Sequence, residues 1–303
     1  MGLRAENTRT SGYSRDSDST HTNSYLKFFP TAYLTWHLGD NRSLSAAYNK
    51  RLDRPGFGML DPYRTYLNSQ TSAQGNPLLQ PSFTDNAELV LNFGNNETKL
   101  YYSYTTGGFD QIAYIDPNNN TTSYTYENYL RSRTWGIEQS LSIKPTNWWT
   151  SSNTVNLSYY QNRSTNPSTP QKADLLSGYF STSNDLTLNH KKNLFFSLGY
   201  WYNLPQVSGV THISAMGSLS ASFKALLFDK KVTVGLSATD ILKTQLATWK
   251  YASNDIQASS RNYFDARQVR LSVSYKFGNK NISVKKETSA TRKIAADQAT
   301  NSH

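Results

Sequence analysis

Few side chains in this sequence stand at the spacings that catalysis or metal binding requires. The five histidines lie far apart, and none has another histidine two or four residues away; a metal site needs ligands that converge. The absence of cysteine excludes thiol catalysis, thiolate metal sites and a disulfide framework. No G-x-S-x-G, H-E-x-x-H or P-loop signature occurs. We therefore expect neither a catalytic, metal or cofactor site nor an enzymatic activity.

The side chains best suited to contact a ligand lie in polar loops. Loop carboxylates sometimes bind calcium, although a role as solvated turn residues is favoured for the four aspartates of these loops: Asp16, Asp18, Asp110 and Asp116. Aromatic loop residues could contact a sugar, a siderophore or a peptide, and the candidates are Tyr63, Tyr66, Tyr114, Tyr124, Tyr126, Trp249 and Tyr251. Tyrosine is also ordinary in exposed loops, so both interpretations of the aromatic residues remain open.

One long connection, from Arg54 to Pro81, is the strongest candidate for a functional element. Prolines and glycines restrict its backbone, and a connection of about 30 residues is usually functional or disordered. Its candidate residues are Arg54, Pro55, Asn76, Pro77 and Pro81. These five either belong to a binding loop or stabilise the mouth of the structure that carries it, and the stabilising role is favoured.

The overall composition narrows the fold class. Of the 303 residues, 37% are hydrophobic, 17% charged and 13% aromatic, which argues against both a helical bundle and disorder. The net charge of +10 is scattered along the chain, so nucleic-acid binding is disfavoured. No stretch is long and apolar enough for a membrane helix. Because residues 1–6 have no apolar run, the chain either stays in the cytoplasm or is a piece of a longer protein.

Alternation with a period of two indicates that the chain is all-β. Near the end, Val269, Leu271, Val273, Tyr275 and Phe277 interleave with polar residues. The same pattern recurs along the chain, for example over residues 212–223, and predicts about twelve strands and no helix. His212 and Ser220 share the polar face of that segment. A serine and a histidine that hydrolyse lipid would have to lie on the face toward lipid, so these two residues do not predict such an activity.

The connections between these strands alternate in length. Short turns are predicted at residues 39–41, 94–97, 145–147, 190–193 and 228–231, and long polar loops near 12–24, 53–82, 107–130, 164–174 and 241–262. Outer-membrane barrels sort their connections in this way, with short periplasmic turns and long extracellular loops. Aromatic residues near the short turns fit a membrane-interface belt, namely Trp36, Phe93, Trp148, Trp149, Phe228 and Phe277. The sequence therefore predicts an antiparallel up-and-down transmembrane β-barrel portion with a polar lumen.

Three segments in the first part of the chain resemble a known family. They are Arg51 to Phe57, Leu60 to Arg64 and Gly75 to Pro81, and they are similar to a pattern in the Bacteroidetes outer-membrane beta-barrel family, whose members look like TonB-dependent receptors. The resemblance implies an active transporter of a large nutrient, such as a glycan, siderophore or peptide. It also implies contact with outer-membrane lipid in a bacterial outer membrane.

The resemblance further implies how the chain is organised. Family members carry a signal peptide, a small N-terminal domain, a plug and about 22 strands, and only the last dozen or so strands are expected here. Residues 1–278 would be the C-terminal barrel portion, and residues 279–303 a polar, basic and disordered tail. The barrel-assembly machinery would read the terminal strand Val269 to Phe277, whereas the TonB-type energy-coupling protein would act only through the missing plug.

Two alternatives remain beside this hypothesis. A self-contained 12-stranded barrel could act as a passive channel or a surface adhesin, since barrels of 8 to 26 strands exist. A soluble β protein that binds glycans or nucleic acid is the third interpretation and is less favoured.

Overall fold

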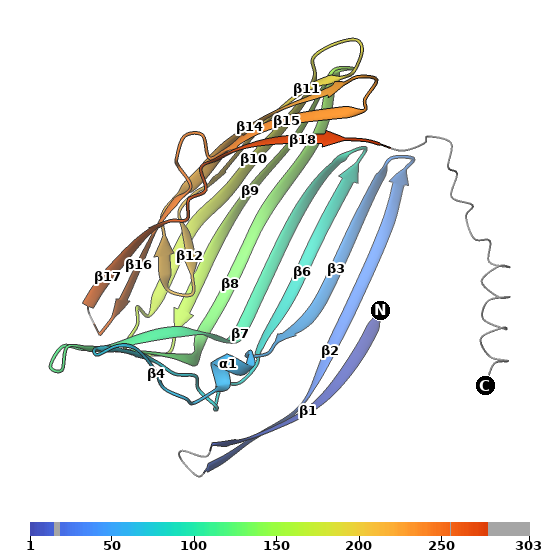
Figure 1. The fold of residues 1–303 in the computed structure, drawn as a ribbon. Helices are drawn as coiled ribbons and strands as arrows, with labels where there is room; N and C mark the ends of the chain where they lie inside the picture. Colours follow the sequence, from blue (N-terminus) through green and yellow to red (C-terminus); the bar gives the residue numbers. More distant parts are fainter. Residues whose placement is uncertain (15–18, 255, 278–303) are drawn as a thin grey trace, which may run out of the picture.

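The computed structural model describes residues 1–14, 19–254 and 256–277, and this part of the chain is almost entirely β (Figure 1). Twelve strands form one continuous antiparallel sheet, called the wall here. In spatial order the wall strands are β1 (Gly2–Ser14), β2 (Ser19–Gly39), β3 (Arg42–Asp53), β6 (Ser82–Phe93), β7 (Asn96–Asp116), β8 (Thr121–Thr146), β9 (Trp149–Ser164), β10 (Lys172–Thr187), β11 (Leu194–Asn203), β14 (Met216–Leu227), β15 (Val232–Thr239) and β18 (Gln268–Tyr275).

The remaining elements lie at one end of the wall, opposite the short turns (Figure 1). A four-residue helix, α1 (Phe57–Leu60), precedes the hairpin of β4 (Thr65–Asn68) and β5 (Thr71–Ala73), and β5 pairs in parallel with β8. A second sheet has the order β12–β13–β16–β17. Its strands are β12 (Gln206–Ser208), β13 (Thr211–Ile213), β16 (Leu246–Ser253) and β17 (Ile256–Tyr263). We call this end the long-loop end and the other the short-turn end.

The five short turns predicted from the sequence are confirmed. Each joins two neighbouring wall strands at the short-turn end, as in the β6–β7 connection, where the strands end at Phe93 and resume at Asn96. Gly94 adopts a φ of 58° there, a left-handed conformation that costs glycine little. Its N–H donates to the carbonyl of Asn41 in the adjacent turn at 2.8 Å. Turns of neighbouring hairpins are thus linked into one rim.

The outer face of the wall is apolar and exposed, as the alternation predicts. Across β2 and β3, Ala32 lies opposite Tyr48 and Trp36 opposite Leu44. On β8 the exposed apolar face runs from Trp135 to Ile143, about 26 Å of strand at the usual rise per residue. Strands tilted by 35–45° convert this length into a band of about 20 Å. Lipid, rather than a second protein layer, suits such a surface.

The one polar residue that interrupts this face of β8 has its hydrogen bonds satisfied. The hydroxyl of Thr98 donates to Oε1 of Gln139 at 2.6 Å. The amide nitrogen of Gln139 donates to the carbonyls of Glu97 at 2.9 Å and Ser140 at 3.3 Å. Because lipid offers no hydrogen-bond partner, these contacts allow a glutamine within the apolar band.

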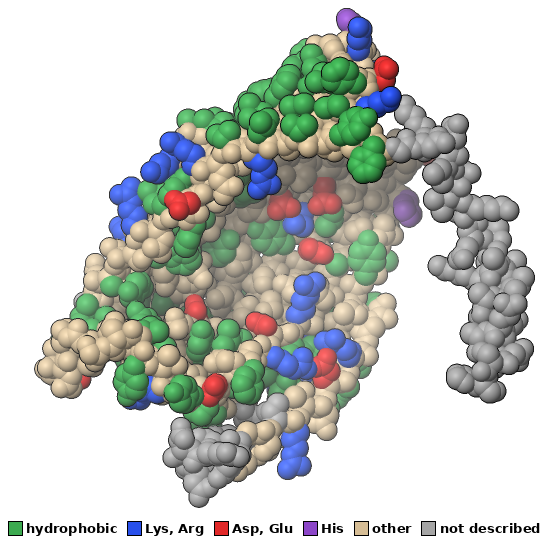
Figure 2. Space-filling model, in the orientation of Figure 1, with side chains coloured by type: hydrophobic (Ala, Val, Ile, Leu, Met, Phe, Trp, Pro, Cys, Tyr) green, Lys and Arg blue, Asp and Glu red, His purple; other side chains and the backbone are tan. Residues whose placement is uncertain are grey.

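The inner face is concave and carries charged and polar side chains (Figure 2). Lys99 and Glu138 form an ion pair at 2.9 Å. Beside them, the Tyr101 hydroxyl lies 2.5 Å from the Ser158 hydroxyl. Gly136 makes room for this tyrosine, since a Cβ at that position would lie 2.6 Å from the Tyr101 hydroxyl. Such a hydrogen-bonded surface suits a water-filled or protein-filled lumen and not an apolar core.

The prediction of long loops is wrong for two segments, which consist largely of strands. Residues 107–130 are mostly strand, because β7 and β8 continue as one hairpin to a turn at residues 117–120. Residues 241–262 contain most of the β16–β17 hairpin of the second sheet. The predicted loop at 12–24 is also partly strand, since β1 reaches Ser14 and β2 begins at Ser19. The prediction failed because polar strands that stand in water lack the apolar alternation on which it relied.

The single strand predicted over residues 212–223 is also wrong. Ile213 pairs with Trp249 of β16, and the wall resumes only at Met216. Ser214 marks the break: its N–H donates to the Thr248 carbonyl, and its hydroxyl accepts from the Thr248 N–H, both at 2.9 Å. His212 therefore lies in the second sheet and Ser220 in the wall. Helix α1 likewise departs from the prediction of no helix.

The wall is curved but not closed. Among the described residues, β1 pairs only with β2 and β18 only with β15, so the two strands are opposite edges of the sheet (Figure 1). No helix in the described part of the chain is long and apolar enough to cross a membrane. The predicted tail, 279–303, lies outside the described residues.

Candidate functional site

The long-loop end builds a structure of its own, which we call the platform: residues 54–81, 107–130, 164–173, 204–215, 241–254 and 256–263. Its centre is a compact apolar cluster consisting of Ile112, Tyr129, Leu130, Ala173, Val207 and Val210. β7 and β8 supply three of these side chains, and the β12–β13 hairpin folds over them. Burial in this cluster raises the pKa of the Tyr129 hydroxyl, and the nearby Asp110 adds to the effect.

The predicted candidate connection, residues 54–81, is an ordered part of the platform. Gly75 is buried where its N–H donates to the Asp61 carbonyl at 2.8 Å. A Cβ on Gly75 would lie 2.6 Å from that same oxygen, so only glycine fits. Next to it, the Asn76 side chain donates to the Tyr126 carbonyl and accepts from the Leu78 N–H, both at 2.9 Å. The segment is thereby fixed to β8.

The five candidate residues of this segment do not converge on one point of contact. The Arg54 guanidinium forms an ion pair with Glu6 of β1, whereas Asn76 contacts β8. Pro81 is buried immediately before β6, and Pro55 and Pro77 are partly buried beside Arg54 and Asn76 in the chain. The contacts of Arg54 and Asn76 connect the segment to two wall strands. A ligand-binding role for the five residues stays a prediction.

The two predicted loop aspartates that the structure describes, Asp110 and Asp116, have different surroundings. Asp116 organises the β7–β8 turn, where its carboxylate accepts from the Asn118 N–H at 2.9 Å and from the Asn119 side chain at 2.7 Å. These bonds, the Asn119 contact first, lower the pKa of Asp116. Asp16 and Asp18 lie outside the described residues. Within the described part, no group of three potential metal-ligating side chains comes together.

Asp110 instead lines a cavity between the β7–β8 hairpin and the second sheet. The cavity has a volume of about 310 Å³. Four aromatic residues line it, Tyr124, Tyr129, Trp249 and Tyr251, three of which were candidates from the sequence. Burial raises the pKa of Asp110. Sequence reasoning missed Tyr129, since nothing local distinguishes it from other tyrosines, and it did not bring Asp110 together with the aromatic residues.

The other four aromatic candidates lie elsewhere in the platform. Tyr63 and Tyr66 are exposed, and Tyr114 donates its hydroxyl proton to Glu127 at 2.6 Å. Tyr126 contributes its carbonyl to Asn76. The predicted aromatic set thus divides between the cavity and other surroundings.

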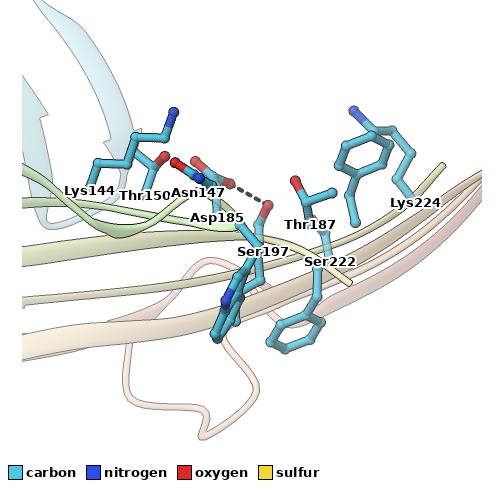
Figure 3. Close-up of a pocket in the computed structure, with 12 residues that line it drawn as sticks. Lys144, Asn147, Thr150, Asp185, Thr187, Ser197, Ser222 and Lys224 are labelled. Atoms are coloured by element: carbon cyan, nitrogen blue, oxygen red, sulfur yellow. Dashed lines mark hydrogen bonds between the residues drawn. The ribbon is translucent and has the colours of Figure 1, made fainter. Parts of the chain in front are cut away.

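A second cleft, of about 400 Å³, lies on the wall near the short-turn end (Figure 3). Lys144, Asp185 and Lys224 project from the same side of the sheet there. Asp185 accepts a hydrogen bond from the Ser197 hydroxyl, and the Lys224 ammonium stands 4.7 Å from the centre of the Phe195 ring. These residues have ordinary strand spacing, so nothing in the sequence singled them out.

A family model for the outer membrane protein beta-barrel family matches residues 1–275. The chain belongs to this family. The protein is therefore an outer-membrane barrel protein, and the exposed apolar face of its wall is the face toward lipid. A comparison with curated protein sequences gives no match.

Solved structures of outer-membrane proteins have a similar fold. The FrpB iron transporter from Neisseria meningitidis is 15% identical, with a TM-score of 0.58 over 91% of this chain and 41% of that one. The siderophore receptor PirA from Acinetobacter baumannii is 12% identical, with a TM-score of 0.54 over 85% and 42%. PirA from Pseudomonas aeruginosa is 12% identical, with a TM-score of 0.53 over 80% and 44%. This outer-membrane chain spans less than half the length of these receptors.

Proposed function

We propose that this chain is the C-terminal part of the barrel of a TonB-dependent receptor-like transporter of the Bacteroidetes type. The intact protein would take up a large nutrient of the glycan, siderophore or peptide class. Residues 1–278 would form barrel wall and loops, and residues 279–303 a polar tail. The short-turn end would face the periplasm and the platform the cell exterior, the usual orientation of outer-membrane barrels.

The open wall is the observation that carries this proposal. β1 and β18 each have a single partner strand among the described residues, and each unpaired backbone group in lipid costs several kcal/mol. Both edges must therefore find partners in the membrane. Further strands of a larger barrel would supply them, in agreement with the chain's span of 41% to 44% of the similar receptors.

The polar inner wall supports a filled barrel. The Lys99–Glu138 pair and the cleft with Lys144 and Lys224 offer charged contacts to a plug domain outside this chain. A TonB-type protein would act on that plug and not on the wall. The terminal segment predicted as the strand Val269 to Phe277 would be the element read by the barrel-assembly machinery. In the structure its strand, β18, ends at Tyr275, and Phe277 follows it with a strongly exposed side chain.

Folding the isolated chain tests this proposal against a self-contained barrel. The chain would be refolded in detergent, and the product examined by gel mobility before and after boiling and by single-channel conductance. We expect aggregation and no pore of fixed size, because the edges of the wall stay unpaired. A stable monomer with a reproducible conductance would reject the larger barrel and favour a 12-stranded channel.

A further inference from the structure

We call the platform cavity between the β7–β8 hairpin and β16 the aromatic pocket. The residues that line it favour a positively charged ligand. Among the lining residues that the structure describes, Asp110 is the single charged one. The other lining residues are aromatic, aliphatic or uncharged polar. We propose that the aromatic pocket binds an organic cation, an ammonium or guanidinium group carried by a small molecule or by a peptide side chain. The inference rests on the proposed receptor function for access to the pocket from outside the cell.

The carboxylate of Asp110 has capacity for a ligand. Its Oδ1 accepts from the Gln111 N–H at 2.7 Å. No Lys or Arg of the described residues lies within ion-pair distance of it, although five ion pairs form elsewhere in that part of the chain. A partly buried carboxylate without a cation is costly, and a bound ammonium or guanidinium would neutralise it. A neutral sugar would leave the charge uncompensated.

The aromatic side chains supply the second element of cation recognition. Trp249 is 37% exposed, so one part of its surface is open to a ligand. Tyr124 and Tyr251 adjoin each other. Burial raises the pKa of the Tyr124 hydroxyl, and the neighbouring Tyr251 raises it further. The negative faces of Trp and Tyr rings attract cations within about 6 Å, most strongly when water is excluded. A carboxylate together with several such rings is the usual composition of an ammonium site.

The pocket is held in shape by contacts between the two sheets. The Ser253 hydroxyl donates to the Ala113 carbonyl, and the Asn254 N–H donates to the Ser168 carbonyl at 2.9 Å. Gly209 closes one side with a φ of 56°, and a Cβ there would lie 3.0 Å from Oδ2 of Asp110. A pocket whose walls are fixed by such contacts needs little ordering on binding, which favours affinity.

A comparison of choline with its uncharged isostere 3,3-dimethyl-1-butanol separates the effect of the ligand's charge on binding from that of its shape. The intact receptor that contains this chain would be purified in detergent and titrated with each compound, with calorimetry and tryptophan fluorescence as readouts. We expect choline to bind and the isostere to bind at least tenfold more weakly. Lysine amide and arginine amide would show whether the cation of a peptide side chain enters as well.

Variants assign the effect to the pocket. Asp110→Asn should weaken choline binding at least tenfold, and Trp249→Phe should remove the fluorescence change. Asp116→Asn, which alters a loop carboxylate outside the pocket, should leave choline binding unchanged. Equal binding of choline and the isostere, no binding of choline, or unchanged binding by Asp110→Asn would overturn the inference. Binding in detergent does not depend on transport, so a failure of the proposed uptake function would be seen separately.

Discussion

The wall and the platform of this protein use the same strands in opposite ways. In the wall, large apolar side chains such as Ile137 and Leu271 are exposed by 43% and 68%, and lipid replaces a protein core. In the platform, Ile112 and Leu130 are exposed by only 3% and 7%, because water surrounds that region and apolar residues must be buried against one another. β7 and β8 run through both regions.

This difference shows where a binding site can be built. The buried side chains of the wall are mostly small and polar, such as Ser158 and Ser177, and its inner face consists of polar groups paired across strands. The platform has a packed cluster and a cavity with a partly buried carboxylate. A binding site of defined shape and charge is therefore formed in the platform, where extended hairpins enclose a cavity.

Removing a side chain from the platform cluster should have the largest local effect. Leu130→Ala should destabilise the platform by about 2–5 kcal/mol, the usual cost of a cavity in a packed core. Faster amide exchange and proteolysis in residues 204–215 would report it, while the wall keeps its protection. Leu67→Ala, at a side chain exposed by 63% in the platform, should change little. Equal effects of the two substitutions would contradict a packed platform.

A charge on the outer face of the wall should be the next largest perturbation. Ile137→Arg should destabilise the inserted protein by about 2–4 kcal/mol, the cost found near the bilayer midplane. The matched variant is Ser140→Arg, which places the same side chain on the inner face opposite Glu97. Denaturant unfolding in lipid vesicles measures both. If Ser140→Arg is the more damaging, the faces of the wall are assigned wrongly.

The Asn76 contact tests whether the 54–81 segment depends on its attachment to β8. Asn76→Ala removes two hydrogen bonds, one to the Tyr126 carbonyl, and should cost about 1–3 kcal/mol locally. Amide exchange of residues 71–81 should increase. Asn118→Ala, at an exposed turn position, is the control and should leave that segment unchanged.

The smallest expected effect concerns pH at the platform tip. Hydrogen bonds from Asn119 and Asn118 lower the folded-state pKa of Asp116. The stabilisation is therefore complete above the unfolded value of about 3.9 and is lost as pH falls through the lower folded value. The protection factors of the amides of residues 117–120, which correct for the intrinsic pH dependence of exchange, should fall below about pH 4 in the wild type. Asp116→Asn should lack this pH dependence, and an identical profile for both would contradict the assignment.

The wall could be predicted from the sequence more fully than the platform. Alternation locates the strands that face lipid, and the turns at residues such as Gly39 and Gly94 fix their neighbours. The β13 strand could not be found, because local polarity does not reveal that Ile213 pairs with Trp249 and not with a wall strand. Asp110 and Trp249 line the same pocket although they are 139 positions apart in the sequence, and no local pattern encodes such an arrangement.

The distance between the two edge strands tests most directly the claim that this chain is part of a larger barrel. Leu3 on β1 and Leu271 on β18 both face outward and are exposed by 70% and 68%. This chain has no cysteine, so Leu3→Cys and Leu271→Cys introduce its only labelling sites. Pulsed electron paramagnetic resonance on the intact receptor, with any cysteine outside this chain replaced by serine, measures the distance between the two spin labels. With strands spaced and tilted as usual, we predict roughly 40 Å for a barrel of about 22 strands. A distance below about 15 Å would mean that β1 and β18 are neighbours, and would contradict the account.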